Sequence, residues 1–224
     1  MLILFVCWGA FFIYCLIRFR QRAGHKAMYE PVKAKLAKYA EYAVIVVEAF
    51  MLIGLSMPVW ASYKNDLPAR SQSLEVKVTA EQFAWNFHYA GPDGIFGKTD
   101  VKYIDNFGNA VGLDPNDPNG KDDIVTLNEL HVPVDKPVIL DITSKDVIHS
   151  FTVNVLRVKQ DAVPGMLIPI HFQATPNSIG QYDISCAQLC GLGHYRMRGA
   201  ISIDSPADFA KWVSEQEAAK GGNQ

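Results

Sequence analysis

The sequence predicts an N-terminal two-helix transmembrane hairpin, an all-β sandwich and a short C-terminal helix. The first 62 residues are far more apolar than the rest of the 224-residue chain, which indicates a membrane anchor followed by a water-soluble domain. From Leu74 onward, short alternating runs of apolar and polar residues are separated by Gly, Pro, Asn and Asp, as in β-strands joined by turns. The net charge of −2 argues against a nucleic-acid partner.

The first apolar run, Met1 to Ile17, contains no charged residue, and Arg18, Arg20 and Arg22 follow it. A secretory signal peptide is the alternative, but signal peptides carry their charge before the apolar core and small residues after it. Because the order is reversed here, we interpret the run as a transmembrane helix near the lower length limit of about 17 residues.

A second apolar run covers residues 39–62, and Trp60 lies near its end, where interfacial aromatic residues are common. The loop between the two runs, residues 18–38, carries seven basic residues against one acid, Glu30. The basic residues are Arg18, Arg20, Arg22, Lys26, Lys33, Lys35 and Lys38. The positive-inside rule places this loop in the cytoplasm. We therefore expect a multi-pass membrane protein with its β domain outside the cytoplasm, in a periplasm or an equivalent space.

Two acids, Glu41 and Glu48, lie seven residues apart and so share one face of the second helix. An ionisable side chain within a membrane span costs a few kcal/mol and usually faces protein or water. The predicted hairpin, residues 1–63, is therefore expected to pack in the lipid bilayer against a larger integral-membrane partner.

The β domain is predicted to span residues 74–205, after a polar linker at residues 64–73 that contains Pro68. Short strands separated by turns indicate an antiparallel sandwich or barrel. A C-terminal helix and tail, residues 206–224, are expected because Phe209 and Trp212 share one helical face. The candidate strands are residues 74–80, 85–89, 131–134, 137–143, 150–158, 168–174, 180–185 and 199–203.

The acid-rich segment 91–127 separates two of these strands. Its LDPNDPNGKDD run is faintly similar to a calcium loop, but Gly120 is out of register with the consensus. A solvated loop and an acidic docking surface for a basic partner are the two other interpretations.

The densest chemistry lies in the run CAQLCGLGHYRM, residues 186–197. Its spacing is C-x₃-C-x₃-H-x₂-M, and all four of these side chains are soft or borderline metal ligands. A structural zinc site is disfavoured, because such sites use two ligand pairs and the β domain contains no second cysteine pair.

A mononuclear blue-copper site needs two histidines, one cysteine and a weak axial methionine. The run supplies one histidine, and His149, at the start of a predicted strand, is the best second one. This interpretation leaves Cys186 unexplained, whereas two thiolates that bridge two copper ions account for it. Each copper would then have both sulfurs, one histidine and one weak axial ligand. The predicted ligands are His149, Cys186, the Gln188 carbonyl, Cys190, His194 and Met197.

The run CAQLCGLGHYRM, together with KDVIHSFTV and LRVKQDAVPGM upstream, resembles subunit II of haem–copper cytochrome c oxidases, with their binuclear CuA centre. The resemblance covers nearly the whole chain and implies a cupredoxin-like Greek-key sandwich. It further implies that CuA accepts electrons from a donor outside the membrane and passes them to haem in subunit I. There oxygen is reduced to water and protons are pumped, so this chain would hold no catalytic residue itself. Subunit III is a further expected partner.

Three departures from the family pattern affect the expectations. Most members have Glu at the position of Gln188, and that side chain resembles a ligand to a magnesium or manganese ion at the subunit I interface, so this ion is in doubt here. Members carry a Q-W-x-W run for electron entry, whereas this chain has Gln82-Phe83-Ala84-Trp85, which makes Phe83 or Trp85 the entry residue. No C-x-x-C-H motif is present, so the donor is a separate protein: cytochrome c, or a quinol-oxidising complex such as alternative complex III.

The resemblance also implies roles for three acids. Glu41 stands where the family has an acid at the mouth of a proton channel in subunit I, and Glu48 is the alternative. Asp146, three residues before His149, and Asp161 are expected to hold the copper ligands in place.

Three other functions fit the sequence less well. Quinol-oxidising relatives lose the copper ligands, which this chain keeps. The helical hairpin argues against a soluble denitrification enzyme with CuA. A membrane-anchored copper chaperone would expose its cysteines and would not need an axial methionine in a closed ligand set.

Overall fold

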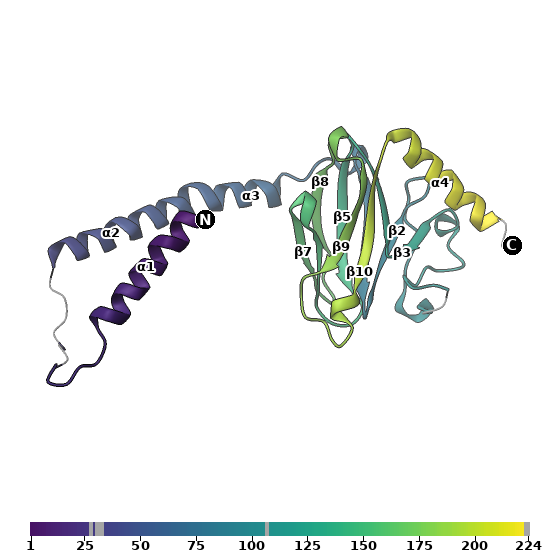
Figure 1. Ribbon diagram of the computed structural model, residues 1–224. Helices are drawn as coiled ribbons and strands as arrows, with labels where there is room; N and C mark the ends of the chain where they lie inside the picture. Colours follow the sequence, from purple (N-terminus) through teal and green to yellow (C-terminus); the bar gives the residue numbers. More distant parts are fainter. Residues whose placement is uncertain (27–28, 30–33, 106–107, 222–224) are drawn as a thin grey trace. The chain divides into compact units, whose positions relative to one another are not determined.

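The computed structural model describes residues 1–26, 29, 34–105 and 108–221 (Figure 1). Glu30 and Lys33 of the predicted basic loop and residues 222–224 of the predicted tail lie outside the described residues. The chain divides into two compact units, Met1–Pro58 and Val59–Gln224. The predicted hairpin boundary at residue 63 falls within the second unit, where the Tyr63 hydroxyl donates a hydrogen bond to the carbonyl of His171 at 3.1 Å.

The N-terminal part is helical. Helix α1 covers Leu2–Arg18. Helix α2 (Lys35–Ala49), a π-helical turn (Phe50–Ser56) and α3 (Met57–Asn65) form a continuous helical run, Lys35–Asn65. Among the described residues this run of 31 residues is the one helix long and apolar enough to cross a membrane, while α1, with 17 residues, is shorter. The second predicted span is therefore supported. The two-helix hairpin is supported only in part, because α1 is the shorter helix.

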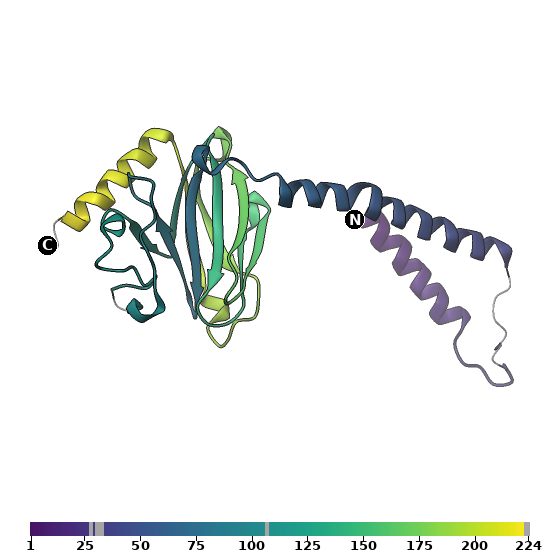
Figure 2. The ribbon, with the colours of Figure 1, turned by 180° about the vertical axis from the view of Figure 1, so that it is seen from behind.

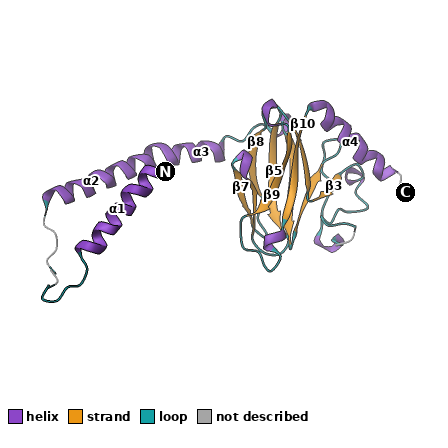
Figure 3. Ribbon diagram, viewed as in Figure 1, coloured by secondary structure: helices purple, strands orange, loops and turns teal. Residues whose placement is uncertain are grey.

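Two five-stranded sheets form the β domain and face one another (Figures 1 and 3). The first sheet has the order β3-β2-β1-β5-β8 and the second has the order β4-β10-β9-β6-β7. The strands are β1 (Leu74–Glu81), β2 (Ala84–Tyr89), β3 (Ile124–Leu127), β4 (Glu129–Pro133), β5 (Pro137–Ser144), β6 (His149–Val153), β7 (Val158–Ala162), β8 (Ile168–Gln173), β9 (Gly180–Cys186) and β10 (Arg198–Asp204). The predicted all-β sandwich is confirmed.

Alternation along the strands builds the core between the sheets. On β1, Val76, Val78 and Ala80 are buried, while the intervening polar side chains point away from the core. Trp85 on β2 and Phe151 on β6 meet across the core edge to face, with ring centroids 5.5 Å apart, and neither has exposed surface. Such aromatic pairs stabilise the contact between sheets beyond the area they bury.

Three details of the predicted strands are wrong. The candidate strand 150–158 is a hairpin of β6 and β7, because a 3₁₀ turn follows β6 and Arg157 adopts a left-handed conformation that reverses the chain. The sheets are mixed rather than purely antiparallel, since β1 pairs with β5 and β10 with β4 in parallel. The end of the acid-rich segment forms β3, which pairs with β2 at the edge of the first sheet.

Helix α4 (Pro206–Gly221) confirms the predicted C-terminal helix. It packs against β4 and β10, and both views show it, in yellow, beside the sandwich at the C-terminal end of the chain (Figures 1 and 2). Its Trp212 is buried and stacks on the ring of His131 at a centroid distance of 4.4 Å. The Nδ1 atom of His131 lies 2.7 Å from a carboxylate oxygen of Asp204, so the ring is fixed between α4 and the sheet.

The acid-rich segment uses many of its carboxylates to bind its own backbone. Asp93 accepts the N–H of Ile95, and Asp117 accepts the N–H of Lys98. The buried carboxylate of Asp123 accepts the N–H of Gly97 and bonds to the ring of His88. These bonds fold the segment locally, as Asp side chains commonly do in turns.

Two valines on either side of a strand end test the core. Val153, at the end of β6, is fully buried, whereas Val155 is 59% exposed. We expect Val153→Ala to lower the unfolding free energy by about 2 kcal/mol, from lost methyl burial and the cavity left behind. Val155→Ala, the matched control, should change it by less than about 0.5 kcal/mol. Chemical denaturation of the chain in detergent measures both, and equal effects would contradict this description of the core.

Candidate metal centre

The predicted metal ligands converge at one end of the sandwich. Cys186 ends β9 and Met197 directly precedes β10, so the run between them is a loop whose two ends are held by adjacent antiparallel strands. The two cysteine sulfurs lie 3.8 Å apart, and the sulfur of Cys190 lies 3.8 Å from that of Met197 and 3.7 Å from Nδ1 of His194. The sulfur of Cys186 lies 3.1 Å from the carbonyl oxygen of Gln188.

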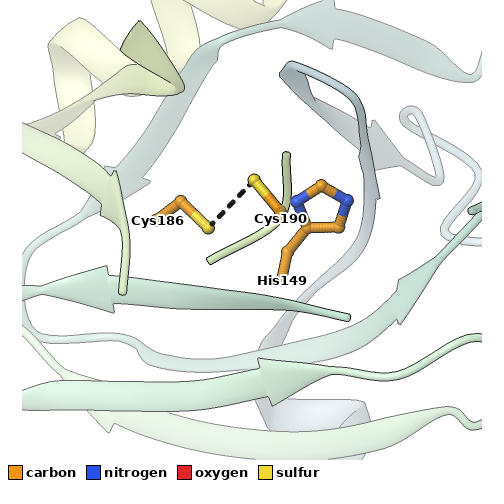
Figure 4. Close-up of side chains that lie close together, drawn as sticks. All are labelled: His149, Cys186 and Cys190. Atoms are coloured by element: carbon orange, nitrogen blue, oxygen red, sulfur yellow. Dashed lines mark hydrogen bonds between the residues drawn. The ribbon is translucent and has the colours of Figure 1, made fainter. Parts of the chain in front are cut away.

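His149 reaches the same place from a different part of the chain. It is the first residue of β6, which pairs with β9, so that Phe151 lies opposite Cys186. Its ligand atom and the two thiol sulfurs lie within 4.8 Å of one another (Figure 4). Its Nδ1 atom lies 3.1 Å from the sulfur of Met197. All six predicted ligand groups are therefore brought together.

Burial divides the ligands into an inner and an outer group. His149, Cys190 and Met197, the inner group, are exposed by 0%, 4% and 1%. The outer ligands reach the surface: Cys186 and His194 are half-buried and Gln188 is exposed. The two histidines thus lie on different sides of the cysteine pair, one inside the domain and one at its edge.

The donor set fits a soft metal ion that both thiolates would hold. All four cysteines of the chain are free, and a separation of 3.8 Å is far longer than the roughly 2.0 Å of a disulfide. Metal–thiolate bonds are about 2.3 Å long, so one ion can contact both sulfurs at this separation. Cysteine sulfur, imidazole and methionine sulfur are the ligands that copper prefers.

Without a cation the thiol of Cys190 is held in its neutral form. Burial, and then the neighbouring Cys186, raise the pKa of the Cys190 thiol to about 11. A metal ion must therefore displace protons when it binds, because the thiolate is the ligand. The site favours occupation by a cation over two closely spaced negative charges, one of them on the buried Cys190.

Asp146 holds His149 in place. Its Oδ1 atom lies 2.8 Å from Nε2 of His149, which leaves Nδ1 directed at the ligand cluster. Burial alone would raise the pKa of Asp146, but hydrogen bonds from His149, the N–H of Gln82 and the N–H of Val147 lower it below its usual value. The carboxylate therefore stays ionised, and it fixes the orientation of the imidazole.

The other predicted site residues lie at varying distances from the ligands. Asp161 accepts a hydrogen bond from the hydroxyl of Ser150 at 2.6 Å, one residue away from His149. Phe83 is half-buried below the loop, with the guanidinium of Arg196 at 5.7 Å from its ring. Trp85 is fully buried, and its ring lies edge to face with that of His149 at 6.2 Å. Glu41 is exposed on α2.

Three further histidines of the β domain have partners elsewhere. His88 lies against Asp123, His131 against Asp204, and Nε2 of His171 against the carbonyl of Tyr63. Of these three histidines and His149, only His149 lies beside both cysteines.

One contact of the site was not anticipated. The side-chain amide of Gln82, in the turn between β1 and β2, donates a hydrogen bond to the carbonyl of Cys190 at 2.6 Å. A side chain at Gly193 would overlap the ring of Phe83, so the loop can approach this turn only with glycine there. The only signal in the sequence was the position of Gln82 directly before the expected entry residue.

Comparison with known proteins gives consistent matches. Residues 74–205 match the family described as cytochrome c oxidase subunit II, periplasmic domain. The chain is 36% identical over 212 residues to the alternative cytochrome c oxidase subunit 2 of Bradyrhizobium diazoefficiens, covering 94% of this chain and 74% of that protein. It is 29% identical over 227 residues to cytochrome c oxidase subunit 2 of Synechocystis, covering 92% and 66%.

A third relative and a solved structure belong to the same group. Identity to cytochrome c oxidase subunit 2 of Thermostichus vulcanus is 33% over 153 residues, covering 68% of this chain and 36% of that protein. The chain thus spans less than two thirds of the length of two of these three relatives. The periplasmic domain of cytochrome oxidase subunit II from Bradyrhizobium japonicum is 29% identical, with a TM-score of 0.49, covering 68% of this chain and 98% of that one.

The hydrogen bond between Asp146 and His149 generates a prediction for metal binding. We expect Asp146→Ala to weaken copper binding about 10- to 100-fold, because the imidazole loses the group that orients it. Asp161→Ala removes a carboxylate that contacts Ser150 instead and should have a smaller effect. Competitive titration with a copper chelator measures both affinities. Equal losses in the two variants would show that Asp146 has no special role.

Proposed function

The chain belongs to the cytochrome c oxidase subunit II family, and we propose that its β domain holds a binuclear CuA centre through which electrons enter a haem–copper oxidase. Family membership makes it subunit II of a haem–copper oxidase, an oxidoreductase complex. One observation carries the proposal: the ligand atoms of both cysteines and of His149 lie within 4.8 Å of one another, with Met197, His194 and the Gln188 carbonyl around them.

The residues perform two tasks at this centre. Cys186 and Cys190 provide two thiolates at a separation that two ions can share. Two of the inner ligands, His149 and Met197, lie in the core, where water is excluded. When bound, a binuclear copper pair supplies one-electron transfer with small rearrangement, since the electron is shared over two metals. The closed ligand set leaves no position for a substrate.

Under this proposal the domain receives electrons from a separate donor and delivers them to haem in subunit I, where oxygen is reduced and protons are pumped. The donor is cytochrome c or a docked quinol-oxidising complex such as alternative complex III. Subunit III is a further proposed partner. Exposed apolar residues on the ligand loop support contact with another protein: Leu189 is 80% exposed and Leu192 is 97% exposed.

We assign electron entry to Phe83 at the surface and Trp85 behind it. Phe83 packs beneath the ligand loop, and Trp85 lies between the sheets with its ring against His149. An aromatic residue that touches the loop offers a short path from a docked donor. Trp85 has no exposed surface, and its ring lies against that of His149.

The exposed side chain of Gln188 lies at the proposed interface with subunit I. Its carbonyl is the part directed at the cysteine pair, and its amide is a neutral group. Magnesium and manganese prefer carboxylate oxygens over amides. We therefore propose that any magnesium or manganese ion at this interface is bound more weakly than in relatives with Glu.

The periplasmic domain and one candidate membrane helix indicate a membrane-anchored protein. We further propose that α1 is a second span, that both chain ends face the periplasm, and that the membrane is the bacterial inner membrane. The support is the basic loop after α1. Within the second span, Glu41 is proposed to lie at the entrance of a proton channel in subunit I.

Replacing one cysteine tests the binuclear centre. We expect the wild-type chain to bind two coppers, with a purple mixed-valence spectrum and a seven-line EPR pattern. Cys186→Ser should bind one copper with a four-line pattern, because only one thiolate remains. Copper analysis and EPR spectroscopy measure the change. Cys7→Ser, on α1, is the matched control and should leave both unchanged. A four-line signal from the wild-type chain would refute the proposal.

The proton-entry role of Glu41 is tested in the assembled oxidase. Glu41→Gln should slow oxygen reduction several-fold, since a neutral amide cannot carry a proton, while the copper spectra stay the same. Glu48→Gln, one heptad further along the same helix, is the control. Normal turnover in Glu41→Gln with slow turnover in Glu48→Gln would assign the entrance to Glu48 instead.

A further inference from the structure

We propose that Gln82 is a positioning residue of the copper centre, which ties the electron-entry turn to two of the inner ligands, Cys190 and His149. This inference rests on the proposed function. It concerns a residue that supplies no metal ligand and lies on a different strand connection from every ligand.

The first connection runs through the side chain of Gln82. Its Nε2 atom donates to the carbonyl oxygen of Cys190 at 2.6 Å. The two residues are 108 positions apart in sequence, so the bond joins the β1–β2 turn to the ligand loop. Gly191 follows directly, with a φ of +135°, which L-residues rarely adopt. A Cβ atom there would lie 2.6 Å from Nε2 of Gln82, so the amide occupies the space beside the loop.

The second connection runs through the backbone of the same residue. The N–H of Gln82 donates to Oδ2 of Asp146 at 2.7 Å, while Oδ1 of Asp146 lies 2.8 Å from Nε2 of His149. One carboxylate thus holds Gln82 with one oxygen and an inner ligand with the other. The chain of bonds runs from Cys190 through Gln82 and Asp146 to His149.

Packing of the next residue makes this arrangement rigid. The ring of Phe83 fills the space below Gly193, where a side chain would overlap it. The loop is therefore held at Cys190 by a hydrogen bond and three residues later, at Gly193, by a ring. A change at Gln82 should alter the position of the Cys190 peptide without removing any ligand.

Electrostatics gives the sign of the effect. The side-chain N–H of Gln82 presents its positive end to the carbonyl of Cys190, whose thiolate would bind copper. Removing it makes the surroundings of the centre more negative and favours the more positively charged, oxidised state. A carboxylate at this position would favour that state further. The reduction potential should therefore be highest in the wild type, lower in Gln82→Ala and lowest in Gln82→Glu.

The test uses the full chain in detergent, with copper as the probe. Copper affinity is measured by chelator competition, and the reduction potential by voltammetry. We expect Gln82→Ala to bind copper about tenfold more weakly, at the low end of such outer contacts because Gln82 is exposed. Gln82→Glu keeps the size of the side chain and the backbone bond to Asp146. Its effect on the reduction potential therefore reports the change of charge and not a loss of folding.

Gln181→Ala at the start of β9 is the matched control, since this exposed glutamine lies at the other end of that strand from Cys186. Its affinity and potential should equal those of the wild type. If both Gln82 variants match Gln181→Ala in affinity and in potential, the positioning role is overturned. A wild-type chain that does not take up two coppers overturns the proposed function, and this inference with it.

Discussion

Residues 190–193 pass so close to the β1–β2 turn that side chains at two of their positions would collide with it. This close approach sets the position of the ligand loop, because the antiparallel strands β9 and β10 fix only its ends. Cys190, His194 and Met197 then have little freedom relative to the sandwich. The site is positioned by contact with a rigid β-sheet edge, as functional constellations generally need.

This arrangement makes ionisation of the thiols unfavourable. Two thiols and an imidazole are gathered where water is scarce, and burial raises the pKa of Cys190 to about 11. Ionising both thiols without a compensating cation is unfavourable. Folding therefore prepares ligands at the right spacing, and metal binding supplies the positive charge that lets them ionise. The carboxylate of Asp146 contributes the remaining negative charge from behind His149, where it binds the ring edge that faces away from the cysteines.

Much of the site could be predicted because its information is local. The spacing from Cys186 to Met197 follows from one short loop, and the residues around His149 show a strand beginning there. The contact between Gln82 and Cys190 joins positions 108 residues apart, and no periodicity or spacing reports such a pairing. The same holds for the fold: the left-handed residue that reverses the chain is Arg157, where glycine or asparagine would be usual. Strand β3 is four residues long and follows two acids, so it lacks a strand pattern of its own.

Under the proposed function, the division of the ligands by burial bears on how electrons would cross the domain. His149 and Met197 are enclosed between the sheets, while His194 and the Gln188 carbonyl are at the surface, beside exposed leucines of the same loop. Two partners can therefore reach the centre by different routes. One can meet the outer ligands directly, and the other can approach the loop from below, through the ring of Phe83. The side-chain amide of Gln82 lies beside Phe83 and bonds to the peptide of Cys190. A change at Gln82 should therefore affect both the second route and the ligand loop.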